Sequence, residues 1–268
     1  MEWRLIHSGA EQPPRNMAVD EAILETFCRG HIPPTLRIYR WDRLAVSIGY
    51  FQNYERSIRR GVDVPVVRRP TGGRAVPHGT DITFSLVAPG GLLGRRVGDS
   101  YRRIGAAVCR ALNSLGIGAE FCPDNGTRGD LNAVNCFELG LKYELSVGGK
   151  KVLGSAQARR GDAVLQQNSL ILQPPNSAVL EAINSEAWES AGLAHTMEAV
   201  ETNLVVEVER EFGICLTSGE LTSLELELAG MFERKYGDCA WTVRRECALT
   251  ENLTPCYTST ESYSRRHS

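Results

Sequence analysis

Apolar side chains recur every three or four residues in three parts of the chain, which is the spacing of one face of an α-helix. The first part is "MAVDEAILETFC", residues 17–28, where we expect Asn16 to cap a helix that opens the chain. The second covers residues 101–115 and stops at Gly116, a residue suited to the end of a helix. Both parts predict amphipathic helices that bury one face.

The third helical part lies near the C-terminus of the chain. Thr217 and Glu220 have the spacing of a capping box, and they precede an apolar stripe that we expect to pack on a sheet. The stripe consists of Leu221, Leu224, Leu228 and Phe232. From about residue 243 the periodicity ends and Ser, Thr and Arg become frequent, which indicates a flexible tail over residues 243–268.

Short runs of β-branched and aromatic residues, separated by Gly, Pro and polar residues, fill the region between the first two helices. They predict strands at residues 35–41, 44–51, 64–69 and 82–88. Farther along, "YELSV" and "VLGSAQA" flank Gly148-Gly149 as the strands of a hairpin do, and "AVLQQNSLIL" predicts another strand. Helices and strands together predict one α+β domain over residues 1–242.

Composition and charge narrow the class of protein. The chain has 268 residues, of which 42% are hydrophobic, and this is enough to bury a sizeable core. The formal net charge of −2 gives no electrostatic sign of a nucleic-acid or anionic-membrane partner. Charged residues interrupt the N-terminal segment, and no run of about 18 apolar residues occurs. We therefore expect a cytoplasmic protein without a nucleic-acid or membrane partner.

The eight cysteines are scattered, with neither a C-x-x-C pair nor histidines at zinc-ligand spacing. In a reducing compartment, and in a chain with this much apolar core, we expect neither disulfides nor a metal site. The ordinary role of each thiol is then that of a buried or bystander group. Cys136 is set apart because it lies fifteen residues before Lys151, in a segment that leads into the predicted hairpin.

A second segment of chemical interest is "VVRRPTGGRAVPHGTDITFSL". Gly72 and Gly73 permit a turn whose backbone can approach a ligand closely. Arg68, Arg69, Arg74 and His78 surround that turn. Such a turn can hold a carboxylate, a phosphate or a thioester carbonyl, but it is equally compatible with a solvated hairpin. The sequence contains no Walker phosphate-binding loop and no dinucleotide fingerprint.

The chain resembles the lipoate and biotin protein ligase superfamily and, within it, the LipM-type octanoyltransferases. The motifs that carry the resemblance extend over most of the length of the chain. They are "NMAVDEAI", "LRIYRWDRLAVSIGYFQN", "VRRPTGGRAVPHGTDITFSL", "CFELGLKYELSVGGKKVLGSAQARRGDAVLQQNSLIL" and "ERKYGDCAW". The resemblance implies a single α+β catalytic domain whose mixed central β-sheet, flanked by helices, cradles an eight-carbon acyl chain.

The resemblance also implies which residues form the site. Cys136 matches the cysteine that accepts the acyl group, and Lys151 matches a lysine that can lower the pKa of the thiol or stabilise the oxyanion. The substrate-binding positions are Arg69, Gly72, Gly73, His78, Gly154, Ser155 and Ala156. No metal ligand is implied.

The reaction that the resemblance implies starts from octanoyl-acyl carrier protein as donor. The acceptor is a lysine of a lipoyl domain, such as that of glycine cleavage H protein. The Cys136 thiolate attacks the octanoyl thioester, and the lysine amine then attacks the enzyme thioester to give an amide. Because thioester exchange is near balance and amide formation runs downhill, neither ATP nor another cofactor is implied.

Three alternatives remain open from the sequence. An ATP-dependent lipoate-protein ligase shares the arginine, glycine and lysine motifs but does not need Cys136. An amidotransferase that moves octanoyl groups between lipoyl domains would share the cysteine. A non-catalytic acyl-binding regulator is suggested by Gln167-Asn168, where family members often have His-Gly. Pro77 also departs from the family pattern, which usually has a bulkier apolar residue there.

Overall fold

The structure is a computed structural model that describes residues 1–121, 144–183 and 196–247. Its centre is a six-stranded sheet with the strand order β10-β11-β6-β2-β1-β12. These strands are β10 (Leu153–Arg160), β11 (Ala163–Ile171), β6 (Asp81–Pro89), β2 (Thr35–Trp41), β1 (Glu2–Glu11) and β12 (Cys215–Ser218). β1 pairs in parallel with β2 and β12, whereas the other pairs are antiparallel. The expectation of a mixed central sheet is confirmed.

Two three-stranded sheets accompany the large one. The first has the order β4-β3-β5 and contains β4 (Val66–Arg68), β3 (Ala45–Ile48) and β5 (Val76–His78). The second has the order β7-β8-β9 and contains β7 (Ala119–Phe121), β8 (Leu145–Val147) and β9 (Lys150–Lys151). Gly148 and Gly149 both have positive φ, 56° and 75°, as the two-residue turn of a hairpin requires. The predicted turn is confirmed, but the strand that pairs with β8 across it is β9, whereas residues 153–158 belong to β10, which pairs with β11 in the large sheet.

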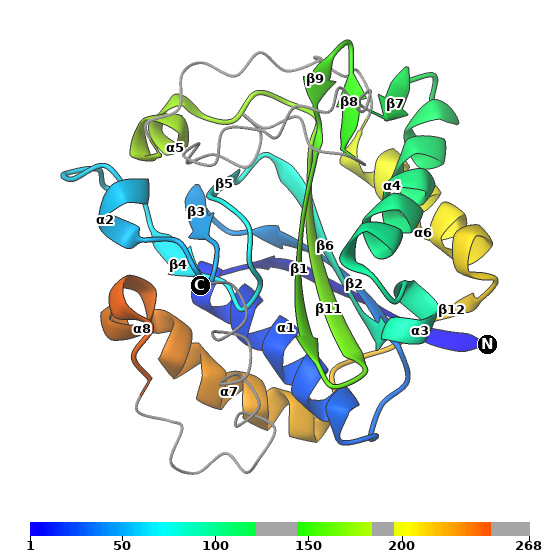
Figure 1. Cartoon of the computed structure of the whole chain (residues 1–268), viewed down its shortest axis with the longest axis horizontal. Helices are drawn as coiled ribbons and strands as arrows, with labels where there is room; N and C mark the ends of the chain where they lie inside the picture. The colour runs from blue at the N-terminus through cyan, green and yellow to red at the C-terminus, as the bar shows by residue number, and fades with distance from the viewer. Residues whose placement is uncertain (122–143, 184–195, 248–268) are drawn as a thin grey trace.

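Helices cover both faces of the large sheet (Figure 1). One face carries α1 (Pro13–Cys28), α7 (Ser223–Gly237) and α8 (Cys239–Arg244), and the other carries α4 (Val97–Asn113) and α6 (Met197–Phe212). Three short helices are α2 (Tyr54–Ser57), α3 (Gly90–Leu93) and α5 (Ser177–Ala182). The α+β class is confirmed, as is the helix predicted at 101–115. Within the described ranges, no helix combines the length and the apolar character needed to cross a membrane.

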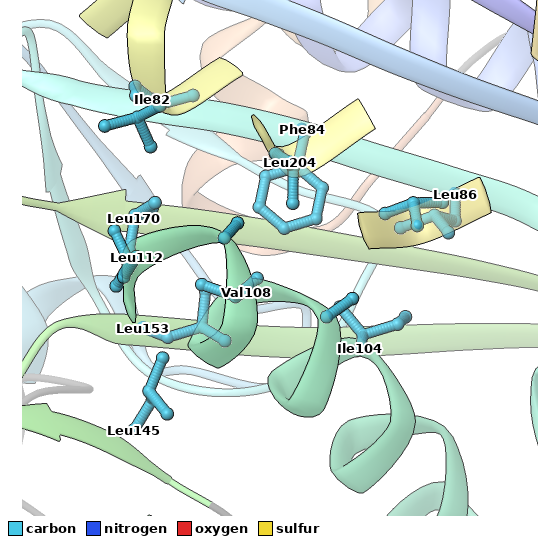
Figure 2. Packing of buried hydrophobic residues seen from close by; sticks show 14 of the residues in the cluster. Ile82, Phe84, Leu86, Ile104, Val108, Leu112, Leu145, Leu153, Leu170 and Leu204 are labelled. Atoms are coloured by element: carbon cyan, nitrogen blue, oxygen red, sulfur yellow. The ribbon is translucent and has the colours of Figure 1, made fainter. Parts of the chain in front are cut away.

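Side chains along the central strands alternate between the two helical layers. Figure 2 shows the layer beneath α4, where the buried residues include Ile82, Phe84, Leu86, Ile104, Val108, Leu112, Leu145, Leu153, Leu170 and Leu204. Thr83 and Ser85, which lie between the apolar residues of β6, donate hydrogen bonds to buried carboxylates instead. β6 therefore separates an apolar core from a face that carries polar chemistry.

The start of the chain differs from the prediction. The strand β1 precedes the first helix, and α1 begins at Pro13, whose fixed φ suits the first turn of a helix. Asn16 lies inside α1 and does not cap it. Its side-chain amide donates to the carbonyl of Arg40 at 2.9 Å and accepts from Arg37 at 2.9 Å. The prediction was wrong because a buried Asn that fastens a helix to a strand has the same sequence signal as a cap.

The start of α7 also differs from the prediction. Thr217 belongs to β12, the edge strand that pairs in parallel with β1. The capping box is formed five residues later by Thr222 and Glu225, each of which bonds the backbone N–H of the other. Leu228 and Phe232 are buried as expected, in a core cluster that contains residues of both α1 and the large sheet, and the helix α7 packs chiefly against α1.

A buried arginine fastens the C-terminal helix to the rest of the fold. The Arg68 guanidinium donates to the carbonyls of Gly49, Tyr50, Gln52, Thr242 and Val243. Burial lowers the pKa of Arg68 to about 10, so the group stays charged at neutral pH. The domain boundary expected after residue 242 falls inside α8. Residues 248–268 lie outside the described residues, and the flexible tail remains a prediction.

Replacing Arg68 with methionine should lower the free energy of unfolding by about 2–4 kcal/mol, because five carbonyl oxygens lose a buried donor. Urea unfolding followed by tryptophan fluorescence measures the change. Arg60→Met is the matched control, since Arg60 is exposed and a surface substitution usually changes stability by less than about 0.5 kcal/mol. Equal effects of the two substitutions would contradict the role given to Arg68.

Candidate active site

A pocket opens beside the polar face of the large sheet, and the space inside it, open solvent included, is about 350 Å³. Its walls come from α1, from four strands of the large sheet, and from β3 and β5. It is lined by Met17, Tyr39, Trp41, Ser47, Arg69, Val76, His78, Thr83, Gly154, Ser155, Ala156, Gln167, Asn168 and Ser169. Five residues expected from the sequence are in this lining, namely Arg69, His78, Gly154, Ser155 and Ala156.

The glycine turn is held against the pocket by its own arginine. The Arg69 guanidinium donates to the carbonyls of Gly72 and Arg74, both at 2.7 Å, and to that of Ser47 at 3.0 Å. Gly73 has a φ of +83°, and a Cβ placed on Gly49 would lie 1.9 Å from the Gly73 oxygen. Only glycines permit this approach. Arg69 therefore shapes the turn that forms one rim of the pocket.

His78 is fixed on three sides. Its Nδ1 lies 2.8 Å from Asp81 Oδ2, and its Nε2 lies 2.8 Å from Ser47 Oγ. Its ring stacks on Trp41, with 3.9 Å between ring centroids and 17° between ring planes. The indole of Trp41 is itself anchored, because its N–H donates to Thr83 Oγ1 at 2.8 Å. The imidazole therefore has one fixed orientation at the pocket wall.

Asp81 is a buried carboxylate surrounded by donors. Its Oδ2 accepts from Thr83 Oγ1 and Ser169 Oγ, both at 2.7 Å, and its Oδ1 accepts from the backbone N–H of Gly79 at 3.1 Å. Burial by itself raises the pKa of this carboxyl. The neighbouring His78 and the hydrogen bonds outweigh burial, and the pKa of Asp81 lies below its ordinary value. Asp81 is therefore a carboxylate at neutral pH.

Gln167 explains one departure from the family pattern. Its side-chain N–H donates to Asp20 Oδ2 at 2.7 Å, and its Oε1 accepts from Thr71 Oγ1 at 2.7 Å. Asp20 also accepts from Arg37 and Tyr39. Burial and the nearby Asp20 together raise the pKa of Tyr39, so its hydroxyl stays protonated and donates. The amide thus joins α1 to the glycine turn through the pocket floor.

The other expected residues lie in different places. Lys151 on β9 forms an ion pair with Glu144, its side chain is 7% exposed, and it does not belong to the pocket lining given above. Gly72 and Gly73 border the pocket through the turn and not as lining residues. Cys136 lies outside the described residues. Among the described residues, no cluster of three or more His, Cys, Asp or Glu is placed to hold a metal ion.

Sequence reasoning did not single out Ser47, Gly49, Trp41 or Asp81. One local signal was available, because Asp81 follows His78 by three residues in "HGTD" and both face the same polar layer. The other residues come together only through the pairing of β3 with β5 and the packing of that sheet on β2. No local sequence pattern predicts that β3 pairs with β5.

Similarity to known proteins adds independent information. The family described as the lipoyl protein ligase A/B catalytic domain matches residues 12–218. The chain is 37% identical to octanoyltransferase LipM of Kyrpidia tusciae, over 91% of this chain and 99% of that relative. It is 34% identical to octanoyltransferase LipM of Symbiobacterium thermophilum, over 91% of this chain and 98% of that relative.

Solved structures of other proteins are similar to the structure of this chain. A T. acidophilum protein with bound lipoic acid matches with a TM-score of 0.77 and 27% identity, over 91% of this chain and 100% of that chain. A lipoate-protein ligase A bound with ATP matches with a TM-score of 0.75 and 26% identity, over 91% of this chain and 99% of that chain.

Proposed function

The chain belongs to the lipoyl protein ligase A/B catalytic domain family, and from this premise we propose that it is an octanoyltransferase of protein lipoylation. The observation that carries the proposal is the identity of 31–37% to several octanoyltransferases over about nine-tenths of the chain. An acyltransferase needs a pocket for the acyl chain beside groups that handle charge and protons. The described residues supply such a pocket.

We propose that the octanoyl chain enters the pocket with its carbonyl near the glycine turn. The apolar part of the lining, which includes Met17, Trp41, Val76 and Ala156, suits a hydrocarbon chain. The polar end of the same pocket contains His78 and Ser47. A thioester has the same division into an apolar chain and a polar carbonyl.

The donor that we propose is octanoyl-acyl carrier protein, and the acceptor is a lysine of a lipoyl domain such as that of glycine cleavage H protein. In the first step the Cys136 thiolate attacks the donor carbonyl, a new C–S bond forms, and the donor thiol leaves. In the second step the acceptor amine forms a C–N bond while the Cys136 thiol leaves. Lys151 would assist by stabilising the thiolate or the oxyanion.

The transfer should proceed without nucleotide, because both steps only exchange one acyl carrier for another. We expect the rate of octanoyl transfer from octanoyl-acyl carrier protein to a lipoyl domain to be the same, within about twofold, with and without ATP and magnesium. Mass spectrometry of the lipoyl domain measures the product.

A ligase would behave differently in the same assay. Its signature would be octanoylation from free octanoate that appears only when ATP is added, and that result would reject the transferase. A lipoyl domain whose acceptor lysine is replaced by arginine is the negative control. A further arm uses an octanoylated lipoyl domain as donor, and transfer confined to that donor would identify an amidotransferase.

A further inference from the structure

We propose that Gln167 is a positioning residue, whose side-chain amide fixes the glycine turn in the place that lets the pocket hold the acyl donor. This inference rests on the proposed function and adds a determinant of donor affinity to it. The amide bridges two buried groups, because its N–H donates to Asp20 Oδ2 and its Oε1 accepts from Thr71 Oγ1, both at 2.7 Å. Thr71 directly precedes Gly72 and Gly73. The bridge therefore runs from the helix α1 to the residue that opens the turn.

Few side chains can make both bonds of this bridge. Asp20 accepts from Arg37 and Tyr39 as well as from the amide, so the group that faces it from β11 has to donate. Thr71 donates, so the group that faces it has to accept. A carboxamide offers a donor and an acceptor at every pH, whereas an ionised carboxylate has no donor and an imidazolium has no acceptor. A glutamine at position 167 therefore makes the bridge at every pH.

Burial makes the loss of this bridge costly. Asp20 and Thr71 are 0% exposed, and Gln167 is 6% exposed. Within the described ranges, the bond to the amide is the only hydrogen bond of the Thr71 hydroxyl. A buried hydroxyl without a partner is destabilising, so we expect the turn to move in a protein that lacks the amide until water reaches the hydroxyl.

A displaced turn changes the pocket, because residues on both sides of the turn line it. Arg69 precedes the turn, Val76 follows it, and both belong to the pocket lining. The Arg69 guanidinium also donates to the Gly72 carbonyl at 2.7 Å, so this part of the lining moves with the turn. On the side away from the large sheet, the backbone N–H of Tyr50 donates to the Thr71 carbonyl at 2.8 Å. The amide supplies the side-chain tie to the large sheet.

The test measures KM and kcat for octanoyl transfer from octanoyl-acyl carrier protein to a lipoyl domain. Gln167→Leu removes both bonds of the bridge at similar side-chain size, and Thr71→Val removes the hydroxyl at the other end. We expect KM for the donor to rise about 10-fold in each variant, with kcat changed less than about threefold, which is the pattern of weakened binding. In the double variant KM should rise no further than in Gln167→Leu, because both groups act through one hydrogen bond.

Thr71→Val separates positioning of the turn from contact with the ligand. Thr71 does not belong to the pocket lining given above, so its substitution leaves the surface that faces the acyl chain chemically unchanged. A rise in KM then has to come from the turn. Thr71→Ser retains the hydroxyl and should retain the KM of the unmodified protein within about twofold.

Gln166→Leu is the matched control for Gln167→Leu. The two glutamines are adjacent on β11, so their side chains point to opposite faces of the sheet. Gln166 is 0% exposed, its Oε1 accepts from Gln157 at 2.6 Å, and it does not belong to the pocket lining. Its substitution should lower the melting temperature and leave KM for the donor within about twofold. A merely structural role of Gln167 would give the two variants the same kinetics.

The possible outcomes have distinct meanings. Unchanged KM in Thr71→Val, or rises that add up in the double variant, would overturn the positioning role. So would a large loss of kcat at constant KM, which would assign the amide to the chemical step. If Gln167→Leu does not fold, the comparison of Thr71→Val with Thr71→Ser still decides. If the unmodified protein transfers no octanoyl group, the proposed function fails together with this inference, whereas transfer with equal KM in all variants rejects the positioning role alone.

Discussion

Cys136→Ser should remove the octanoyl adduct from the protein and lower kcat for transfer by about 10⁴-fold or more, the scale of losing a catalytic nucleophile. A cysteine thiol ionises close to neutral pH, whereas a serine hydroxyl does not, so the variant lacks an attacking anion. The acyl group then has no covalent carrier between donor and acceptor. This is the largest effect that we expect from any single substitution in the chain.

Intact-protein mass spectrometry after incubation with octanoyl-acyl carrier protein measures the adduct directly. The unmodified protein should gain one octanoyl group, and hydroxylamine should remove it, because hydroxylamine cleaves thioesters. Cys215→Ser is the control, since Cys215 is an exposed free thiol on the edge strand β12. An adduct that persists in Cys136→Ser, or one that disappears in Cys215→Ser, would show that another thiol accepts the acyl group.

Lys151→Ala should slow single-turnover acylation by about 10²–10³-fold, the usual loss when one preorganised partner of a developing charge is removed. In the structure the Lys151 ammonium pairs with Glu144, and its side chain is 7% exposed. The ion pair holds the ammonium in one place, while the Glu144 carboxylate offsets part of its charge. Thermal unfolding of the variant shows whether the fold is retained.

Lys150→Ala is the matched control for Lys151→Ala. The two lysines are adjacent on β9, and adjacent residues of a strand point to opposite sides. Lys150 pairs across the hairpin with Val147, next to the turn, and its loss should change acylation less than about threefold. Similar mild effects of both substitutions would mean that neither lysine is catalytic. A large defect confined to Lys150→Ala would transfer the role to that residue.

The parts of the fold that follow from local pattern agree with the prediction. The strand at 35–41 has the predicted bounds, and the Gly-Gly hairpin forms where the turn chemistry requires it. The parts that were wrong depend on distant partners. β1 has few apolar residues of its own and is a strand because β2 and β12 pair with it on either side. The cap of α7 was misplaced for the same reason, since residues 215–218 pair with the chain's first residues.

The candidate site likewise contains some residues that the sequence could identify and others that it could not. Ser155 and Ala156 were expected because they lie in a motif that carries the family resemblance, and His78 also lies beside the predicted glycine turn. Asp81 and Ser47 acquire their chemical meaning only from contacts with His78, and Ser47 is 31 residues away from it in sequence. The burial of Asp81 also contributes to its role in the site. A buried carboxylate with four hydrogen-bond partners has a fixed position that an isolated Asp in the sequence does not reveal.

The contacts of Arg68 have a consequence for how the protein is made on the ribosome. The ribosome synthesises the glycine turn early and α8 late, since Arg68 and Thr242 are 174 residues apart in sequence. Tyr50 bonds Thr71 of that turn, and Arg68 joins the same loop to α8. The nascent turn thus lacks its final support until the ribosome has translated almost the whole catalytic domain. We expect newly made chains to bind acyl groups only after this last segment emerges.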